Sequence, residues 1–210
     1  MLARERPTTM ALYVRRWTGG PDMPDRPEDD DPRTMVLEAF ADTILPGERR
    51  WPGDRAVAGV ASGGGAVAAG AVTLLELPAG GFATALDSLA ATLDDHARAY
   101  ADEHGLAVPG DVPPFVALPF ADRTALVTEL TAPAHPEKEM WIGLAIFATM
   151  AFDSAAHLST PEAIAAGHPG LLGIGYARPG ADRLYRFPDY SYGRQLAQPH
   201  PATTATGSPS

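Results

Sequence analysis

Apolar residues recur at intervals of three and four along most of the chain, the spacing that places them on one face of an α-helix. The clearest series begins at Phe82 and runs to Tyr100, and Gly105 marks its end. The hydrophobic pattern and its flanking residues predict five longer helices and one short one: 32–45, 54–77, 82–104, 119–131, 136–158 and a single turn that starts at Ser159.

Local signals indicate where several of these helices begin and where one is interrupted. Asp31 stands at an N-cap position and Pro32 at the first helical position, so the first helix should start there. Ser159 and Glu162 have the spacing of a capping box at the start of the one-turn helix. The glycines at 63–65 should break or kink the second helix, whose many small residues would let it pack close to a neighbour.

The helix predicted at 136–158 is apolar on nearly every side through its middle. Such a helix normally lies at the buried centre of a domain or faces a partner. Its most apolar run, 140–152, has 13 residues, whereas a helix needs about 20 to cross a bilayer. We therefore expect no membrane span.

The chain divides into three parts by composition. Residues 1–31 form an acidic, proline-rich arm, and residues 197–210 form a low-complexity tail. The helical domain between them covers 32–196, and its last part, 167–194, is rich in Gly, Pro and Tyr. The predicted fold class is all-α: an irregular bundle of about five or six helices with a long C-terminal wrap.

Composition and charge exclude several kinds of chemistry. The chain has no cysteine, which removes disulfides, thiolate nucleophiles, Cys-ligated zinc and iron–sulfur clusters. A formal net charge of −10 disfavours binding to nucleic acid and to anionic lipid. The twin arginine at 15–16 precedes the polar stretch 17–22 instead of an apolar one, so we expect a cytoplasmic protein.

Two pairs of residues on the 136–158 segment have the spacing of metal ligands, but they cannot share one site. His135 and Glu139 lie four residues apart, as do Asp153 and His157. The 14 positions between Glu139 and Asp153 correspond to about 21 Å along a helix. We expect structural or surface roles for these histidines, and no metal or cofactor bound directly by the chain.

Two other motifs favour a structural interpretation. Residues 63–68 fit the loose dinucleotide pattern G-x-G-x-x-A, but no strand precedes them and no βαβ alternation follows. Close packing of small residues explains this stretch better. Asp94, Asp95 and His96 are consecutive on a predicted helix and point in different directions, so a solvated charged face is expected.

The C-terminal aromatic and arginine residues are the clearest candidates for a partner surface. Tyr and Arg are enriched in the cores of protein interfaces. An equally weighted interpretation is that the rings cover the helical core. The predicted partner-binding residues, including two from the 136–158 helix, are Trp141, Phe147, Tyr176, Arg178, Tyr185, Arg186, Tyr190 and Tyr192.

Two stretches resemble the gluconate 2-dehydrogenase small-subunit (subunit 3) family. The first is 37–47 (LEAFADTILPG), followed by Pro-Gly at 52–53 and Gly-Val at 59–60. The second is 150–192, where a helix leads into a segment rich in Gly, Pro and Tyr. The resemblance implies an accessory subunit of a glucose–methanol–choline-type flavoprotein oxidoreductase. In such complexes the large subunit holds FAD, and the small one supports folding, stability or export and has no catalytic residues.

Two other functions stay open at this point. The chain could be a stand-alone cytoplasmic enzyme of small-molecule (secondary-metabolite) biosynthesis, with an apolar pocket beside the 136–158 helix. His157, Asp153 or Tyr176 would then act as general acid or base, and the irregular C-terminal segment as a lid. A regulatory or structural interaction domain without an oxidoreductase partner has the same composition features.

Overall fold

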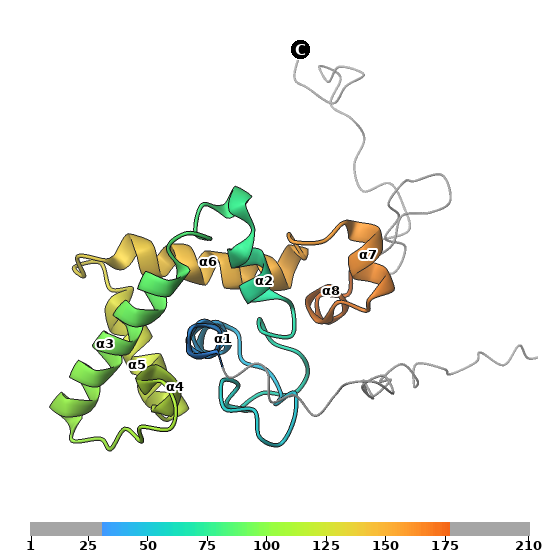
Figure 1. Cartoon of the computed structure of the whole chain (residues 1–210). Helices are drawn as coiled ribbons and strands as arrows, with labels where there is room; N and C mark the ends of the chain where they lie inside the picture. The colour runs from blue at the N-terminus through green and yellow to red at the C-terminus, as the bar shows by residue number, and fades with distance from the viewer. Residues whose placement is uncertain (1–30, 177–210) are drawn as a thin grey trace, which may run out of the picture.

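The computed structural model describes residues 31–176, and in this part of the chain it contains helices and no strand (Figure 1). The fold is an irregular all-α bundle, as predicted. The helices are, in chain order, α1 (Pro32–Ile44), α2 (Ala71–Glu76), the 3₁₀ turn η1 (Pro78–Gly80), α3 (Leu86–His104), α4 (Pro114–Ala117), α5 (Phe120–Leu130), α6 (Lys138–Ser154), α7 (Thr160–Ala165) and α8 (Pro169–Gly173).

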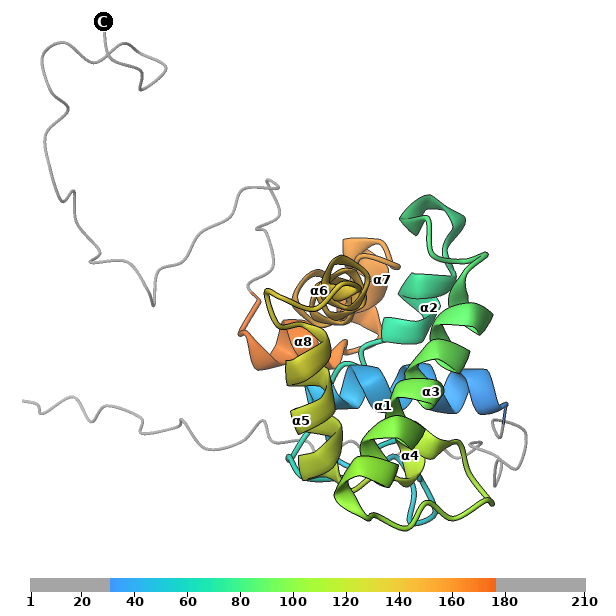
Figure 2. The ribbon, with the colours of Figure 1, turned by 90° about the vertical axis from the view of Figure 1, so that its left-hand side faces the viewer.

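Helix α1 lies at the centre of the bundle and contacts α2, α3, α4, α5 and α6. Figure 1 shows α1 nearly end-on with these helices around it, and Figure 2 shows it crossing between α3 and α5. Eight consecutive residues, 35–42, are buried. Because a helix turns once every 3.6 residues, eight buried positions in a row mean that neighbours cover α1 on all sides.

The helix ends predicted from local signals are confirmed. The Asp31 carboxylate accepts a hydrogen bond from the Thr34 backbone N–H at 3.1 Å, and α1 begins at Pro32. The predicted capping box is present at the start of α7. Gly105 ends α3 in the left-handed conformation, with φ of +64°. Helix α3 starts at Leu86 and not at Phe82, because 82–85 form a turn that precedes it.

The prediction of a helix at 54–77 is wrong for most of this segment. Residues 46–70 form a loop, and only α2 is helical in this segment. Two buried features hold the loop. The α1 carboxylate of Asp42 accepts hydrogen bonds from the backbone N–H groups of Gly47, at 3.1 Å, and Ala58, at 2.8 Å. Gly65 lies so close to Gly47 that each backbone leaves no room for a Cβ on the other.

An ion-pair network joins the loop to α1. Arg50 bonds Glu38 of α1 through both terminal nitrogens, at 2.5 and 2.6 Å, and its Nε lies 2.8 Å from Asp54. Asp54 is buried and also accepts from the Val57 backbone N–H. Buried carboxylates need such partners because an unpaired buried charge costs several kcal/mol.

Arg123 connects the same loop to α5. Its buried guanidinium donates to the backbone carbonyl oxygens of Leu118 at 3.0 Å, Ala56 at 2.8 Å and Val116. Burial lowers the pKa of Arg123 to about 10, so the side chain keeps its positive charge at neutral pH. The loop, α4 and α5 are therefore tied together by one cation.

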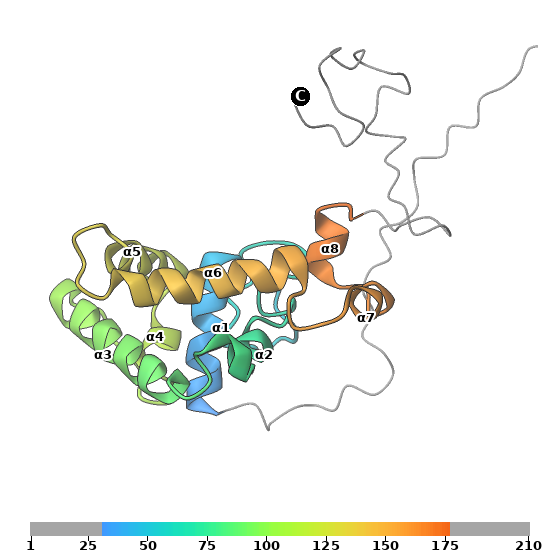
Figure 3. The same ribbon diagram turned by 90° about the horizontal axis from the view of Figure 1, so that it is seen from above.

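Helix α6 is shorter than the predicted 136–158 and is not buried on all sides. It ends at Ser154 because Ala155 adopts the left-handed conformation, with φ of +50°. Trp141, Leu144, Ala148 and Ala151 face the core, while an apolar stripe on another side is exposed. Figure 3 shows α6 running along the outside of the bundle.

Two short α-helices, as well as the 3₁₀ turn η1, were not predicted. The single turn α4 lies in the proline-rich connection before α5. Helix α8 lies within 167–194, which was predicted to be irregular, and its first turn is capped by the His168 side chain. Both begin with proline at the first helical position, where its missing N–H is not needed.

Several predictions fall outside the described residues. These are the N-terminal arm up to residue 30, the C-terminal wrap after residue 176, the tail at 197–210, and the partner-binding residues Arg178, Tyr185, Arg186, Tyr190 and Tyr192. Among the described residues, no helix is long and apolar enough to span a membrane.

The contact between Gly47 and Gly65 gives a test of the loop structure. A Cβ at position 65 would lie 2.4 Å from the Leu45 carbonyl oxygen and 2.6 Å from the Gly47 nitrogen. We expect Gly65→Ala to lower the free energy of unfolding by about 1–3 kcal/mol, because backbone atoms must move. Gly110→Ala is the matched control, since a Cβ there meets nothing within 4 Å. Urea unfolding of both variants checks this, and equal stability would contradict the loop packing.

Candidate functional site

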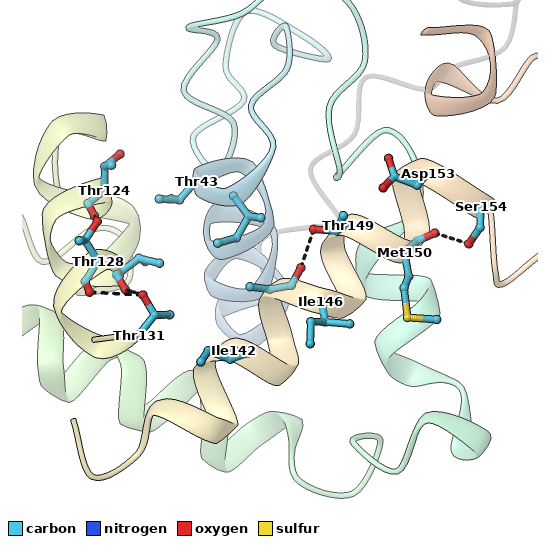
Figure 4. A pocket seen from close by; sticks show the side chains of 13 residues that line it. Thr43, Thr124, Thr128, Thr131, Ile142, Ile146, Thr149, Met150, Asp153 and Ser154 are labelled. Atoms are coloured by element: carbon cyan, nitrogen blue, oxygen red, sulfur yellow. Dashed lines mark hydrogen bonds between the residues drawn. The ribbon is translucent and has the colours of Figure 1, made fainter. Parts of the chain in front are cut away.

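A surface groove of about 700 Å³ lies between α5, α6 and the C-terminal end of α1 (Figure 4). Helix α5 contributes one wall and α6 the other. The lining residues are Thr43, Ile44, Thr124, Val127, Thr128, Thr131, Ile142, Ala145, Ile146, Thr149, Met150, Asp153 and Ser154.

The α6 wall is an exposed apolar stripe. Ile142, Ile146 and Met150 are spaced by four residues, so they follow one another along one side of the helix. Their exposed fractions are 36%, 51% and 40%. Large apolar side chains that are exposed in a row, beside a groove, mark an interaction site more often than an ordinary surface.

The opposite wall carries threonines whose hydroxyl groups are already used. Oγ1 of Thr124 donates to the Phe120 carbonyl oxygen at 2.9 Å, and Oγ1 of Thr128 donates to the Thr124 carbonyl oxygen at 2.7 Å. The other lining hydroxyls donate to carbonyl oxygens of their own helices in the same way: Thr43, Thr131, Thr149 and Ser154. Figure 4 shows several of these bonds.

These hydrogen bonds determine what the groove can do. Every lining hydroxyl proton is bound within a helix, so none is positioned to donate to a ligand without breaking a bond. Asp153 is the one charged side chain among the described lining residues. The walls therefore offer methyl groups and apolar side chains, which favour an apolar binding partner over acid–base chemistry.

The structure separates two residues that were predicted to share a helix face. Asp153 lines the groove, but the chain leaves the helix at Ala155, so His157 does not follow one turn below it. The His157 ring lies against Gly70, where a Cβ would be 2.4 Å from Nε2. Tyr176, the third candidate acid or base, packs against a small cluster of α7 and α8.

The predicted contact residues of α6 lie elsewhere than in the groove. Trp141 is completely buried in the core, so its side chain offers no surface to a partner. Phe147 is half-buried and packs edge-on against Phe82, with ring centroids 5.0 Å apart. The groove residues Ile142 and Ile146 were missed, although their apolar spacing outside the Trp141 face was a visible signal.

Two histidines lie close together between α8 and the loop before α2. Nε2 of His168 donates to the Ala69 carbonyl oxygen at 3.1 Å, and its Nδ1 accepts from the Leu171 backbone N–H. The His157 ring lies 6.0 Å away, and its Nδ1 is buried with no hydrogen-bond partner among the described residues. Burial, and then the neighbouring His168, lower the pKa of His157 below 6.5.

A third cluster joins α3 to the connection between α5 and α6. His96 of α3 lies beside His135 and Glu137, and Nε2 of His96 donates to Oε2 of Glu137 at 2.8 Å. The charged face predicted at 94–96 is thus partly used in tertiary contacts: Asp94 accepts from the Phe115 backbone N–H at 3.0 Å. His135 precedes α6, so its four-residue spacing from Glu139 does not place the two side chains on one helix face.

The lowered pKa of His157 predicts a dependence of stability on pH. The unfolded chain binds this proton more tightly than the folded one, so stability is complete above about pH 6.5 and falls as the pH drops through the folded value. We expect His157→Leu to be less sensitive to acid than the wild type. Urea midpoints at about pH 7 and about pH 5 measure this. His104→Leu, at an exposed position of α3, should keep the wild-type dependence of stability on pH. If the urea midpoint fell equally between the two pH values in both variants, His157 would not be the group responsible.

Comparison with curated proteins and with solved structures gave no match. A protein-family model, described as a family of unknown function (DUF5987), matches residues 31–210. The match starts at the N-cap of α1 and includes every described element of the fold and every residue that lines the groove. The chain therefore belongs to DUF5987, a family of unknown function.

Proposed function

We propose that this protein is a non-catalytic accessory subunit that binds a flavin-dependent alcohol or sugar oxidoreductase through the groove between α1, α5 and α6. The groove itself is the main support for this proposal. It has a row of exposed apolar side chains on α6, and the hydroxyl protons that line it are all bound within helices. In this proposal the partner chain holds FAD and performs the chemistry.

The row of apolar side chains along the groove suits an amphipathic helix of the partner. Helix-in-groove recognition uses apolar side chains spaced by three, four and seven residues, which match a wall made of Ile142, Ile146 and Met150. Covering a half-exposed isoleucine stabilises a complex by about 1 kcal/mol. Several such contacts are needed for stable binding, and the groove offers them in a row.

The sequence resemblance supports the choice of partner, because both of its stretches contribute to the groove. The stretch 37–47 contains Thr43 and Ile44, which line the groove at the end of α1. The stretch that starts at Met150 contributes Met150, Asp153 and Ser154. The small subunits of the gluconate 2-dehydrogenase type, which these two stretches resemble, bind a flavoprotein.

The second candidate function is a stand-alone enzyme that acts on an apolar small molecule. The volume of the groove favours it, since small-molecule sites measure about 300–1,000 Å³. Acid–base catalysis would then depend on Asp153, which is exposed at the end of α6. A single carboxylate without a second convergent polar group makes this candidate weaker than partner binding.

Substitution at the middle of the groove tests the first proposal. Ile146→Arg places a charge among apolar side chains, so we expect the variant to lose its partner while it stays folded. Val60→Arg is the matched control, because Val60 is equally exposed, at 55% against 51% for Ile146, and lies outside the groove. The full chain is purified from its native host, and the eluate is examined for a second chain and for flavin absorption.

The expected result is a yellow complex with the wild type and with Val60→Arg, and a colourless single chain with Ile146→Arg. A colourless wild-type eluate would contradict the flavoprotein proposal. A complex that survives Ile146→Arg would place the interface outside the groove.

A further inference from the structure

We propose that His96, His135 and Glu137 bind one divalent transition-metal ion between α3 and the start of α6, and that this ion is zinc. The three side chains come from two parts of the chain about 40 residues apart. Their ligand atoms already lie within 4.8 Å of one another.

The geometry needs only small side-chain movements to enclose an ion. Zinc binds imidazole nitrogen at about 2.0–2.1 Å and carboxylate oxygen at about 2.0–2.2 Å, so two ligands of one tetrahedral ion lie roughly 3.3 Å apart. His96 Nε2 and Glu137 Oε2 are 2.8 Å apart, and the rings of His96 and His135 have centroids 5.7 Å apart. All three side chains are half-exposed, which leaves them room to turn and lets an ion enter.

The surrounding contacts orient the carboxylate and keep it ionised. Nε1 of the buried Trp141 donates to Oε2 of Glu137 at 3.2 Å, and the Glu137 backbone N–H donates to Nδ1 of His135 at 3.2 Å. The hydrogen bond from His96 lowers the pKa of Glu137 below its usual value. An orientation of this kind, in which a ligand is held by a second hydrogen bond, is typical of metal centres.

Binding requires the proton between His96 and Glu137 to move. Nε2 of His96 gives up the proton that it donates to Glu137, Nδ1 of the same ring carries the proton of the neutral imidazole, and Nε2 and the Glu137 oxygen then coordinate the metal. Two imidazoles and one carboxylate suit zinc, whereas Ca²⁺ and Mg²⁺ prefer oxygen ligands alone. With three protein ligands at a half-exposed position, the fourth coordination position is open to water.

The ion would act on the same helix that forms the groove. Glu137 is the N-cap residue of α6, and Ile142 lies just over one turn further along. An ion coordinated by both Glu137 and His96 would fix this end of α6 against α3. Metal binding by this cluster does not require a flavoprotein partner.

The test is metal binding by the full chain without any added histidine tag. We expect Zn²⁺ titration calorimetry of the metal-free protein to give one saturable site per chain and Zn²⁺ to raise the melting temperature. Co²⁺ should give the visible absorption of a tetrahedral or five-coordinate ion. His96→Gln and Glu137→Gln should each weaken Zn²⁺ binding by about tenfold or more.

His104→Gln is the matched control, because His104 is an exposed histidine on the same helix and should leave Zn²⁺ affinity unchanged. Melting curves of the metal-free variants establish that they are folded before binding is compared. Equal Zn²⁺ affinity in His96→Gln and in the wild type would place the ion elsewhere. Absence of saturable binding to the wild type would overturn the proposal and leave the cluster as an ion pair.

Discussion

The acidic side chains of α1 that point into the interior constrain the rest of the structure. The Asp42 carboxylate is almost completely buried, and burial raises its pKa although the N–H groups of Ala58 and Gly47 bond to it. A buried carboxylate is tolerated only when such donors surround it. The loop 46–70 supplies them, so its path is determined by the need to satisfy α1.

The position of α1 then decides where the groove forms. Because α2 to α6 all contact α1, they are arranged around one axis, and the end of α1 lies between α5 and α6. Arg123 fixes α5 to the carbonyl oxygens of Ala56 and Arg55 in the loop, so that wall of the groove is connected to the same buried network. The position of α1 and its buried network thus determine both the core and the proposed binding surface.

Helix α6 has apolar residues on two sides for two different reasons. The side with Trp141 and Leu144 packs into the core, and the side with Ile146 is exposed in the groove. An exposed apolar row is unfavourable in water and becomes favourable when a partner covers it. The half-exposed histidine and glutamate cluster at the start of the same helix adds a second point at which binding would act on α6.

The amino-acid sequence by itself determined the all-α class and the helix ends that depend on neighbours in the chain. Asp31, Ser159 and Gly105 act on residues within a few positions, so their effects are readable locally. Only the tertiary structure decided the loop at 46–70, the burial of Trp141, the groove and the meeting of His96 with Glu137. These depend on the desolvation and packing of groups far apart in sequence, which no local spacing encodes.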